Sequence, residues 1–237
     1  MLRKLQLWSE LDSDQRAAVL ALPHKVETVR AGAYIVRDRE KATHSCLLLS
    51  GYAIRLKITR GGGRSISAVH LKGDIVDLQN SLLKTADHSV QALTSAEIAR
   101  IPREAIIELA FRMPRVGMAM WYDTLVDASI FREWIANIAR RNARERIAHV
   151  LCEFGVRLES LGLGDRSSFQ FPMTQEQLAD VVGLTPVHVN RSLKRLEADG
   201  LLARTTRYVA VADWASLKKA GDFDEAYLHL HLDTPAL

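Results

Sequence analysis

The hydrophobic and polar positions of the 237-residue chain change their pattern twice along its length. After a short helix predicted at Ser13–Leu22, residues 25–101 contain short apolar runs separated by glycine turns. His44–Leu49 and Tyr52–Ile58 flank Ser50-Gly51, and the second run alternates between apolar and polar residues, as a half-buried strand does. This stretch is therefore predicted to consist of β-strands.

Further turns divide the rest of this stretch. Arg60–Arg64 contains three successive glycines, which adopt positive φ without steric cost, so it is predicted to be a hairpin loop. Ser65–Leu71 is predicted to be the returning strand and Lys72-Gly73-Asp74 the next turn, with two more strands at Val90–Leu93 and Glu97–Ile101. Short strands at such regular spacing are typical of a jelly roll or barrel.

A long helix is predicted over residues 115–140, because apolar residues recur there with helical spacing on two faces. A helix that is apolar on two sides must be covered twice. The preceding domain can cover one side, and the same helix of a second copy is the simplest cover for the other, which favours a homodimer. Burial within one large domain is the alternative. One face carries Met118, Trp121, Leu125, Ala128 and Arg132, and the other carries Val116, Met120, Asp123, Asp127, Ile130 and Trp134.

The most informative motif begins at Thr174, after a helix predicted at Arg144–Leu161. Thr174 can cap a short helix whose end is marked by Gly183, a residue that permits a tight turn. Thr185 can cap a second helix, with Pro186 at its first position, where a missing N–H costs nothing. Two short capped helices joined by a glycine turn predict a helix-turn-helix.

The second of these helices has an apolar back and a polar front. Val189, Leu193 and Leu196 recur at i, i+4 and i+7 and are predicted to face inward. The polar front is what a helix needs to reach base edges and phosphates in the major groove of DNA. The residues predicted to contact bases are Val187, His188, Asn190 and Arg191, and those predicted to contact phosphates are Thr174, Thr185, Lys194, Arg195, Arg204 and Arg207.

A basic, two-stranded wing is predicted directly after this helix. Arg204-Thr205-Thr206-Arg207 forms its tip and Tyr208–Val211 its second strand. From Thr185 to Arg207 there are five Lys/Arg and two acidic residues, so this segment holds +3 of the chain's net charge of +4. Positive charge concentrated there favours binding to the phosphates of DNA.

Composition sets limits on the remaining classes. Hydrophobic residues make up 48% and charged residues 25%, as in soluble globular proteins. There is no apolar run long enough to span a membrane and no signal peptide in Met1–Glu10, so a cytoplasmic protein without a membrane partner is predicted. Cys46 and Cys152 are too few for a four-cysteine metal site. The sequence lacks a Walker-type loop, a Gly-x-Ser-x-Gly elbow and a metal-ligand cluster, and we predict that the protein is not an enzyme.

With these parts in this order, the chain resembles the Crp/Fnr family of bacterial transcription regulators. Gly32, Leu49-Ser50-Gly51, Lys72-Gly73-Asp74 and the stretch Thr174–Leu202 carry the resemblance, which covers about residues 20–211. It implies an α+β chain that acts as a homodimer on palindromic double-stranded DNA and controls RNA polymerase. The implied parts are a jelly-roll sensor domain like a cyclic-nucleotide-binding domain at 1–114, a dimerisation helix at 115–140, a winged helix-turn-helix at 141–215 and a C-terminal tail at 216–237.

The chain departs from the family pattern at the positions that hold a cyclic nucleotide. Family members that bind cyclic AMP carry a glutamate shortly after the Gly-Asp turn and an Arg-Ser pair some ten residues later. Here Leu78 stands near the glutamate position, Asp77 is the alternative partner for a ribose, and His88-Ser89 replaces Arg-Ser. A neutral histidine is a poor substitute for a guanidinium that pairs with phosphate, so cyclic nucleotide binding is not expected. The candidate effector pocket is Asp77, Leu78, His88 and Ser89.

Three further points stay open at the level of sequence. A haem site would have to use His44, His70 or His88, but a lone histidine in such a domain is more often structural, so neither haem nor another cofactor is predicted. On the second helix, Arg191 matches the family's arginine that reads guanine, whereas Val187 or His188 replaces its acidic partner. The alternative function is a sensor protein whose winged helix binds a protein instead of DNA.

Overall fold

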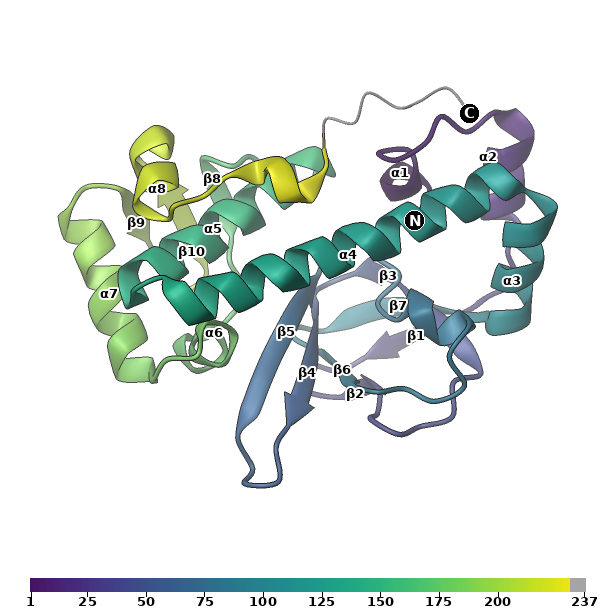
Figure 1. Ribbon diagram of the computed structural model, residues 1–237, viewed down its shortest axis with the longest axis horizontal. Helices are drawn as coiled ribbons and strands as arrows, with labels where there is room; N and C mark the ends of the chain where they lie inside the picture. The colour runs from purple at the N-terminus through teal and green to yellow at the C-terminus, as the bar shows by residue number, and fades with distance from the viewer. Residues whose placement is uncertain (231–237) are drawn as a thin grey trace. The chain divides into compact units, whose positions relative to one another are not determined.

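The computed structural model describes residues 1–230, which fold as two compact units (Figure 1). The first comprises residues 1–63 and 67–128, and the second comprises residues 64–66 and 129–229. The boundary between them falls inside one long helix, so this helix contributes to both. Among the described residues, no helix is long and apolar enough to cross a membrane.

The first unit contains the predicted β-roll, built from two sheets. One sheet has the order β1 (Lys25–Val29), β7 (Ala96–Pro102), β3 (His44–Ser50), and its strand pairs are antiparallel. The other has the order β2 (Tyr34–Val36), β6 (Ser89–Ala92), β4 (Ala53–Ile58), β5 (Arg64–His70). A single apolar core unites the two, because buried residues of both sheets belong to it: Ile35, Cys46, Leu48, Val90, Ala92 and Ile98. The predicted fold class is confirmed, and the predicted strands agree with the observed ones to within one or two residues.

Short helices pack around this roll. The helix α2 (Ser13–Leu20) is two residues shorter than predicted and begins with a capping box formed by Asp12 and Gln15. The helices α1 (Leu2–Leu5), η1 (Leu78–Ser81) and α3 (Arg103–Arg112) complete the unit. A second apolar cluster joins them to the long helix, with Leu5, Val19, Leu78, Ile106, Leu109 and Met120 among its members.

The long helix α4 (Pro114–Arg140) has the predicted extent and the predicted two apolar faces. Two aspartates lie on the buried face because each has a cationic partner: Lys4 Nζ lies 3.0 Å from Asp123 Oδ1, and Arg55 Nη1 donates to Asp127 Oδ2 at 2.6 Å. The buried face includes Val116, Ala119, Met120, Val126, Ile130 and Trp134, and the exposed apolar face, which we call the α4 stripe, consists of Trp121, Leu125, Phe131, Ile135 and Ile138.

In the second unit, α5 (Ala143–Ser160) is the central helix, and α6 (Gln175–Val182) and α7 (Pro186–Ala198) pack on it. The wing has three strands, in the order β8 (Ser168–Gln170), β10 (Tyr208–Val211), β9 (Leu202–Arg204). The prediction of a two-stranded wing was therefore wrong. A third strand, β8, pairs with β10, about forty residues further along the chain.

The predicted tail at 216–237 is also corrected, as far as it lies within the described residues. Residues 214–228 form α8 (Trp214–Ala220) and η2 (Glu225–Leu228), and Leu217 of α8 is fully buried. Gly221 follows α8 and lies so close to α5 that a Cβ there would be 2.6 Å from the backbone nitrogen of His149. This segment is part of the folded unit, and residues 231–237 of the predicted tail lie outside the described residues.

Gly51, in the turn between β3 and β4, gives a test of this fold. Its φ is +79°, and a Cβ would lie 2.4 Å from the carbonyl oxygen of Ser95 and 2.9 Å from Cα of Ala96. Because both are backbone atoms, Gly51→Ala is expected to lower the free energy of unfolding by more than about 2 kcal/mol in urea titrations. Gly62 has φ +84° but no atom within 4 Å of a Cβ, so Gly62→Ala should cost only about 1 kcal/mol. Equal losses in the two variants would contradict the close approach at Gly51.

Candidate nucleic-acid interface

The first helix of the helix-turn-helix, α6, begins and ends as the sequence predicts. The Thr174 hydroxyl accepts a hydrogen bond from the Gln177 backbone N–H at 3.2 Å, and the Gln177 side chain accepts one from the Thr174 N–H at 2.9 Å. Gly183 ends the helix with φ +64°, a left-handed conformation that favours glycine. The capping box and the glycine turn are thereby confirmed.

The second helix, α7, is placed by its cap and by its buried back. The hydroxyl of Thr185 accepts from the backbone N–H of His188 at 3.4 Å, and Pro186 occupies the first position of the helix. Val189, Leu193 and Leu196, which are predicted to face inward, are all buried. Ser192 is buried with them. Their burial fixes which face of α7 is turned outward.

The outward face carries the residues that the sequence assigns to DNA. Val187 is 67% exposed, although it is apolar, and Asn190 is half-buried beside the apolar back. None of the basic side chains on this face forms an ion pair with another described residue, so their donors point to solvent. The exposed residues of the predicted contact set on α7 and in the cap before it are Thr185, Val187, His188, Arg191, Lys194 and Arg195.

The two arginines of the wing differ in their surroundings. Arg207 lies exposed in the turn between β9 and β10. Arg204 instead pairs with Glu197 of α7: its Nε donates to Oε1 at 3.0 Å, and its Nη2 lies 3.5 Å from Oε2. A guanidinium engaged in this way holds the wing against α7. Of the two predicted phosphate contacts in the wing, the Arg207 side chain is exposed and that of Arg204 is engaged with Glu197.

In the first unit, Asp77 and Leu78 of the candidate effector pocket line two different cavities. Asp77 is fully buried, and its Oδ1 accepts from the Cys46 N–H at 2.7 Å. Together with Asn80 and Arg100, Asp77 lines a cavity of about 40 Å³, a volume too small for a nucleotide. Leu78, the next residue, lines a different and much larger pocket.

His88 and Ser89, the pair in place of Arg-Ser, are likewise used within the protein. His88 Nδ1 lies 2.6 Å from Asp87 Oδ1, and the hydroxyl of Ser89 accepts from the backbone N–H of Asp38 at 3.0 Å. Burial lowers the pKa of His88, and the charge of Arg55 adds to the shift, so the charged form of the ring is disfavoured. His88 and Ser89 themselves thus offer no permanent positive charge to a phosphate.

The other groups that the sequence singled out are buried or dispersed. His70 is fully buried with its Nδ1 3.6 Å from Asp74 Oδ2, and burial lowers its pKa to about 4. His44 is exposed at the start of β3. Both cysteines are free and buried, and burial raises the pKa of Cys46 far above its usual value and that of Cys152 to about 12. Neither thiol is held as a thiolate.

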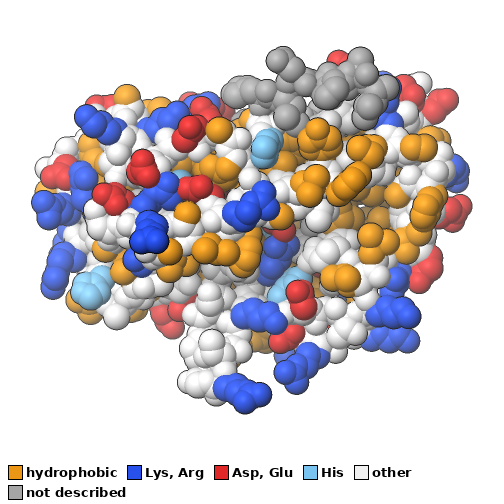
Figure 2. Space-filling model, in the orientation of Figure 1, with side chains coloured by type: hydrophobic (Ala, Val, Ile, Leu, Met, Phe, Trp, Pro, Cys, Tyr) orange, Lys and Arg blue, Asp and Glu red, His pale blue; other side chains and the backbone are white. Residues whose placement is uncertain are grey.

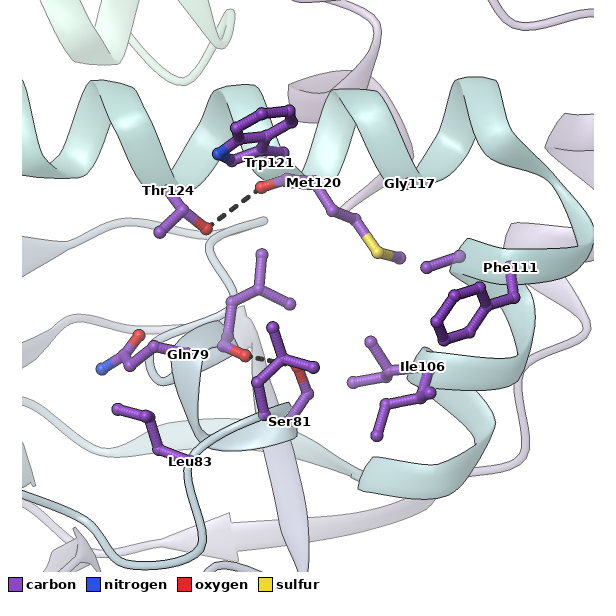
Figure 3. Close-up of a pocket in the computed structure, with 13 residues that line it drawn as sticks. Gln79, Ser81, Leu83, Ile106, Phe111, Gly117, Met120, Trp121 and Thr124 are labelled. Carbon is purple, nitrogen blue, oxygen red and sulfur yellow. Dashed lines mark hydrogen bonds between the residues drawn. The ribbon is translucent and has the colours of Figure 1, made fainter.

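The larger pocket was missed by the sequence analysis. It has a volume of about 570 Å³ and lies between η1, α3 and the first half of α4 (Figure 3). Its apolar residues come from three separate segments, and in the sequence they cannot be distinguished from ordinary core residues. The one signal of the pocket in the sequence is the adjacent apolar pair Leu82-Leu83 in a loop. In the structure both side chains are exposed.

Comparison with known proteins places these parts among described families. Residues 145–220 match the Crp-like helix-turn-helix domain, and residues 26–113 match the cyclic nucleotide-binding domain. The first of these matches extends through α8.

Individual relatives match most of the chain. The transcriptional activator protein FnrL of Cereibacter sphaeroides is 27% identical over 226 residues, which is 93% of this chain and 90% of FnrL. The fumarate and nitrate reduction regulatory protein of Vibrio cholerae is 28% identical over 176 residues, 72% of this chain and 70% of that protein.

Solved structures share the fold at lower identity. FixK2 from Bradyrhizobium japonicum superposes with a TM-score of 0.77 at 22% identity and covers 84% of this chain and 98% of FixK2. The c-di-GMP responsive global regulator CLP of Xanthomonas campestris gives a TM-score of 0.67 at 18% identity, covering 85% of this chain and 100% of CLP.

The buried carboxyl of Asp77 gives a prediction on pH. Burial raises its pKa to about 7 from 3.8, so the folded state binds a proton that the unfolded state releases. Its contribution to stability is complete below about pH 4 and is lost as the pH rises through about 7. The asparagine of Asp77→Asn cannot titrate, so the variant does not lose this stability as the pH rises. The free energy of unfolding of the variant minus that of the unchanged protein should therefore increase by up to about 4 kcal/mol between pH 4 and pH 8.

The measurement is urea unfolding of both proteins at several pH values. The difference between them isolates Asp77 from His70, whose lowered pKa gives the opposite slope in both proteins. Parallel stability curves for the two proteins would show that the pKa of Asp77 does not differ between the folded and unfolded states.

Proposed function

The chain belongs to the Crp/Fnr family of transcription regulators, and we propose that it acts as a homodimer that binds a palindromic promoter site and thereby controls RNA polymerase there. Its homologues are DNA-binding transcription regulators. We further propose that the β-roll regulates this binding in response to an effector. One observation carries the proposal of DNA binding: α7 buries Val189, Leu193 and Leu196 and turns Arg191 and its polar neighbours to solvent.

Arg191 is the proposed reader of a guanine, because a guanidinium can donate two hydrogen bonds to the major-groove edge of that base. It is exposed and forms no ion pair with the other described residues, so binding would not have to break an internal contact. His188 and Asn190 would reach neighbouring base edges, and Val187 would pack on a thymine methyl. This set lacks an acidic side chain that could accept from cytosine.

The proposed phosphate contacts come from the sides of this surface. Lys194, Arg195 and Arg207 are exposed and basic. The first turns of α6 and α7, which follow Thr174 and Thr185, present backbone N–H groups and the positive end of each helix dipole, an arrangement suited to a phosphate oxygen. These contacts position the protein on the duplex without reading sequence.

The α4 stripe supports the homodimer. Trp121 and Leu125 are four residues apart, as are Phe131 and Ile135, and Ile138 follows three residues later; Trp121, Leu125 and Ile135 are each at least 50% exposed. A row of large apolar side chains with this spacing is typical of a helix that packs against a second helix. A copy of α4 would cover the row symmetrically and would pair two DNA-binding units on the two halves of a palindrome.

The DNA interface is tested by two substitutions with different expected effects. Arg191→Ala should cost about 1–3 kcal/mol on the best site and relax specificity at one base pair, because a base contact is lost. Arg207→Ala should weaken binding to all sequences alike and flatten its dependence on salt, because a phosphate contact is lost. Selection of sites from random duplexes, followed by fluorescence anisotropy at several salt concentrations, measures both effects.

Arg112→Ala is the matched control, since Arg112 is an exposed arginine of the first unit. It should leave both specificity and salt slope unchanged. A protein that enriches no palindrome, or that keeps full affinity without Arg191, would favour a protein partner for the winged helix instead.

The dimer is tested by placing a charge in the α4 stripe. Ile135→Asp would bury a carboxylate in the proposed interface, and a buried unpaired charge costs about 3–5 kcal/mol. Sedimentation velocity should therefore show monomers at concentrations where the unchanged protein is dimeric, and affinity for the palindrome should fall with it. Val26→Asp, at a similarly exposed apolar residue of β1, should stay dimeric. An Ile135→Asp variant that remains dimeric would place the interface elsewhere.

A further inference from the structure

The pocket between η1, α3 and α4 is open to solvent and has the size of a ligand site. Its volume of about 570 Å³ lies within the range of small-molecule sites, about 300–1,000 Å³. Figure 3 shows Met120 and Phe111 pointing into this space, with Leu83 and Ile106 on its other sides. The residues that line it are Leu78, Gln79, Ser81, Leu82, Leu83, Ile106, Ile107, Ala110, Phe111, Gly117, Met120, Trp121 and Thr124.

The walls of the pocket belong to the core of the first unit. Leu78, Ile106 and Met120 are nearly fully buried members of one apolar cluster. α3 and α4 approach closely at Gly117, where a Cβ would lie 2.8 Å from the carbonyl oxygen of Ala110. The pocket is therefore a preformed feature of these packed elements.

The chemistry of the lining is almost entirely apolar and carries no charge. The Ser81 hydroxyl donates to the carbonyl oxygen of Leu78 at 2.7 Å, and the Thr124 hydroxyl donates to the carbonyl oxygen of Met120 at 3.1 Å. Both hydroxyl donors are therefore already used. Gln79 remains as the polar group at the edge, with its Nε2 3.3 Å from His88 Nε2. A buried anion would have no cation here and would be strongly disfavoured.

We propose that this pocket binds a neutral, largely apolar small molecule with one N–H or O–H group that donates to the side-chain carbonyl of Gln79. Such a ligand would bury its apolar surface against Leu78, Ile106 and Met120. The site is distinct from the positions of Asp77, His88 and Ser89, which do not line this pocket.

A small molecule suits the shape of this pocket better than the surface of a second chain. The rim is exposed, with Phe111 82% and Leu82 73% accessible, and Figure 2 shows hydrophobic side chains gathered on this face of the protein. A helix of a second copy would cover such a rim. The lining behind the rim is recessed, however, since Ile106 is only 2% exposed and Met120 only 5%. A helix that rests on the rim would leave that depth unfilled.

Occupancy of the pocket would act directly on α4. Trp121 lines the pocket and also belongs to the α4 stripe, and Met120 and Thr124 are its neighbours on the helix. A ligand that prefers one position of these side chains would shift the population of α4 conformations. This consequence rests on the proposed homodimer, whereas the binding itself does not.

The test uses the full-length protein and N-phenyl-1-naphthylamine, a neutral apolar fluorophore with a single N–H group. Saturable binding at about one fluorophore per chain is expected. Thr124→Leu adds bulk inside the pocket and leaves no partner unsatisfied, since the hydroxyl bonds only within its own helix. It should weaken binding about tenfold or more. Thr28→Leu makes the same change at an exposed residue of β1 and should bind as the unchanged protein does.

Ala110→Leu, which fills the pocket from α3, repeats the experiment if Thr124→Leu does not fold. Sedimentation velocity of each variant accompanies the titrations, and an unchanged oligomeric state is expected. Absence of saturable binding, or undiminished binding in the filled variants, would overturn the proposal. Filling that changes the oligomeric state would also overturn it and would identify the pocket as a contact between copies. None of these results bears on DNA binding by Arg191, which is measured separately.

Discussion

The DNA-binding surface depends on the burial of three apolar side chains along one side of α7. Val189, Leu193 and Leu196 are almost completely inaccessible, and they set the rotation of the helix about its axis. Since successive residues of an α-helix are about 100° apart, burying these positions turns Arg191 and Lys194 outward. Packing therefore determines which side chains of α7 are exposed. The buried apolar residues on one side of the helix fix the direction in which the polar residues on the other side point.

The turn before α7 adds the second part of this constraint. Gly183 has a left-handed conformation and lies close to Ile138, so that a Cβ would be 3.3 Å from the Ile138 Cγ2. With Thr185 as the cap, the first turn of α7 can begin only at Pro186. The glycine and the threonine hence decide which residues, Val187 and His188 among them, stand in the first turn of α7. Sequence alone was enough to predict this, because capping and helical turns depend on neighbouring residues.

Features that depend on distant parts of the chain could not be predicted in the same way. β8 has only three residues and becomes a strand by pairing with β10. α8 and η2 are short, and their contacts with α5 hold them in place. The hydroxyl of Tyr227 in η2 donates to Glu153 Oε2 of α5 at 2.8 Å, and Trp134 Nε1 of α4 donates to the same oxygen. A pattern of seven or four residues does not specify such a partner. The prediction of a tail was wrong for residues 216–228 for this reason, whereas α4, with 27 residues of clear periodicity, was predicted to within a residue at its N-terminal end.

The first unit shows why a matching fold does not determine a matching ligand. Its polar candidates were chosen by their alignment with a nucleotide site, but side-chain direction decides their role. Asp77 turns to the backbone of Cys46, His88 to Asp87, and Ser89 to the backbone of Asp38, so each satisfies a neighbour within the protein. The adjacent residue Leu78 points into the apolar pocket. Leu78 thus contributes to a hydrophobic wall and offers no polar group to a ligand. Recognition in this unit would be governed by burial of apolar surface, for which the lining between η1, α3 and α4 is suited, and not by pairing with phosphate.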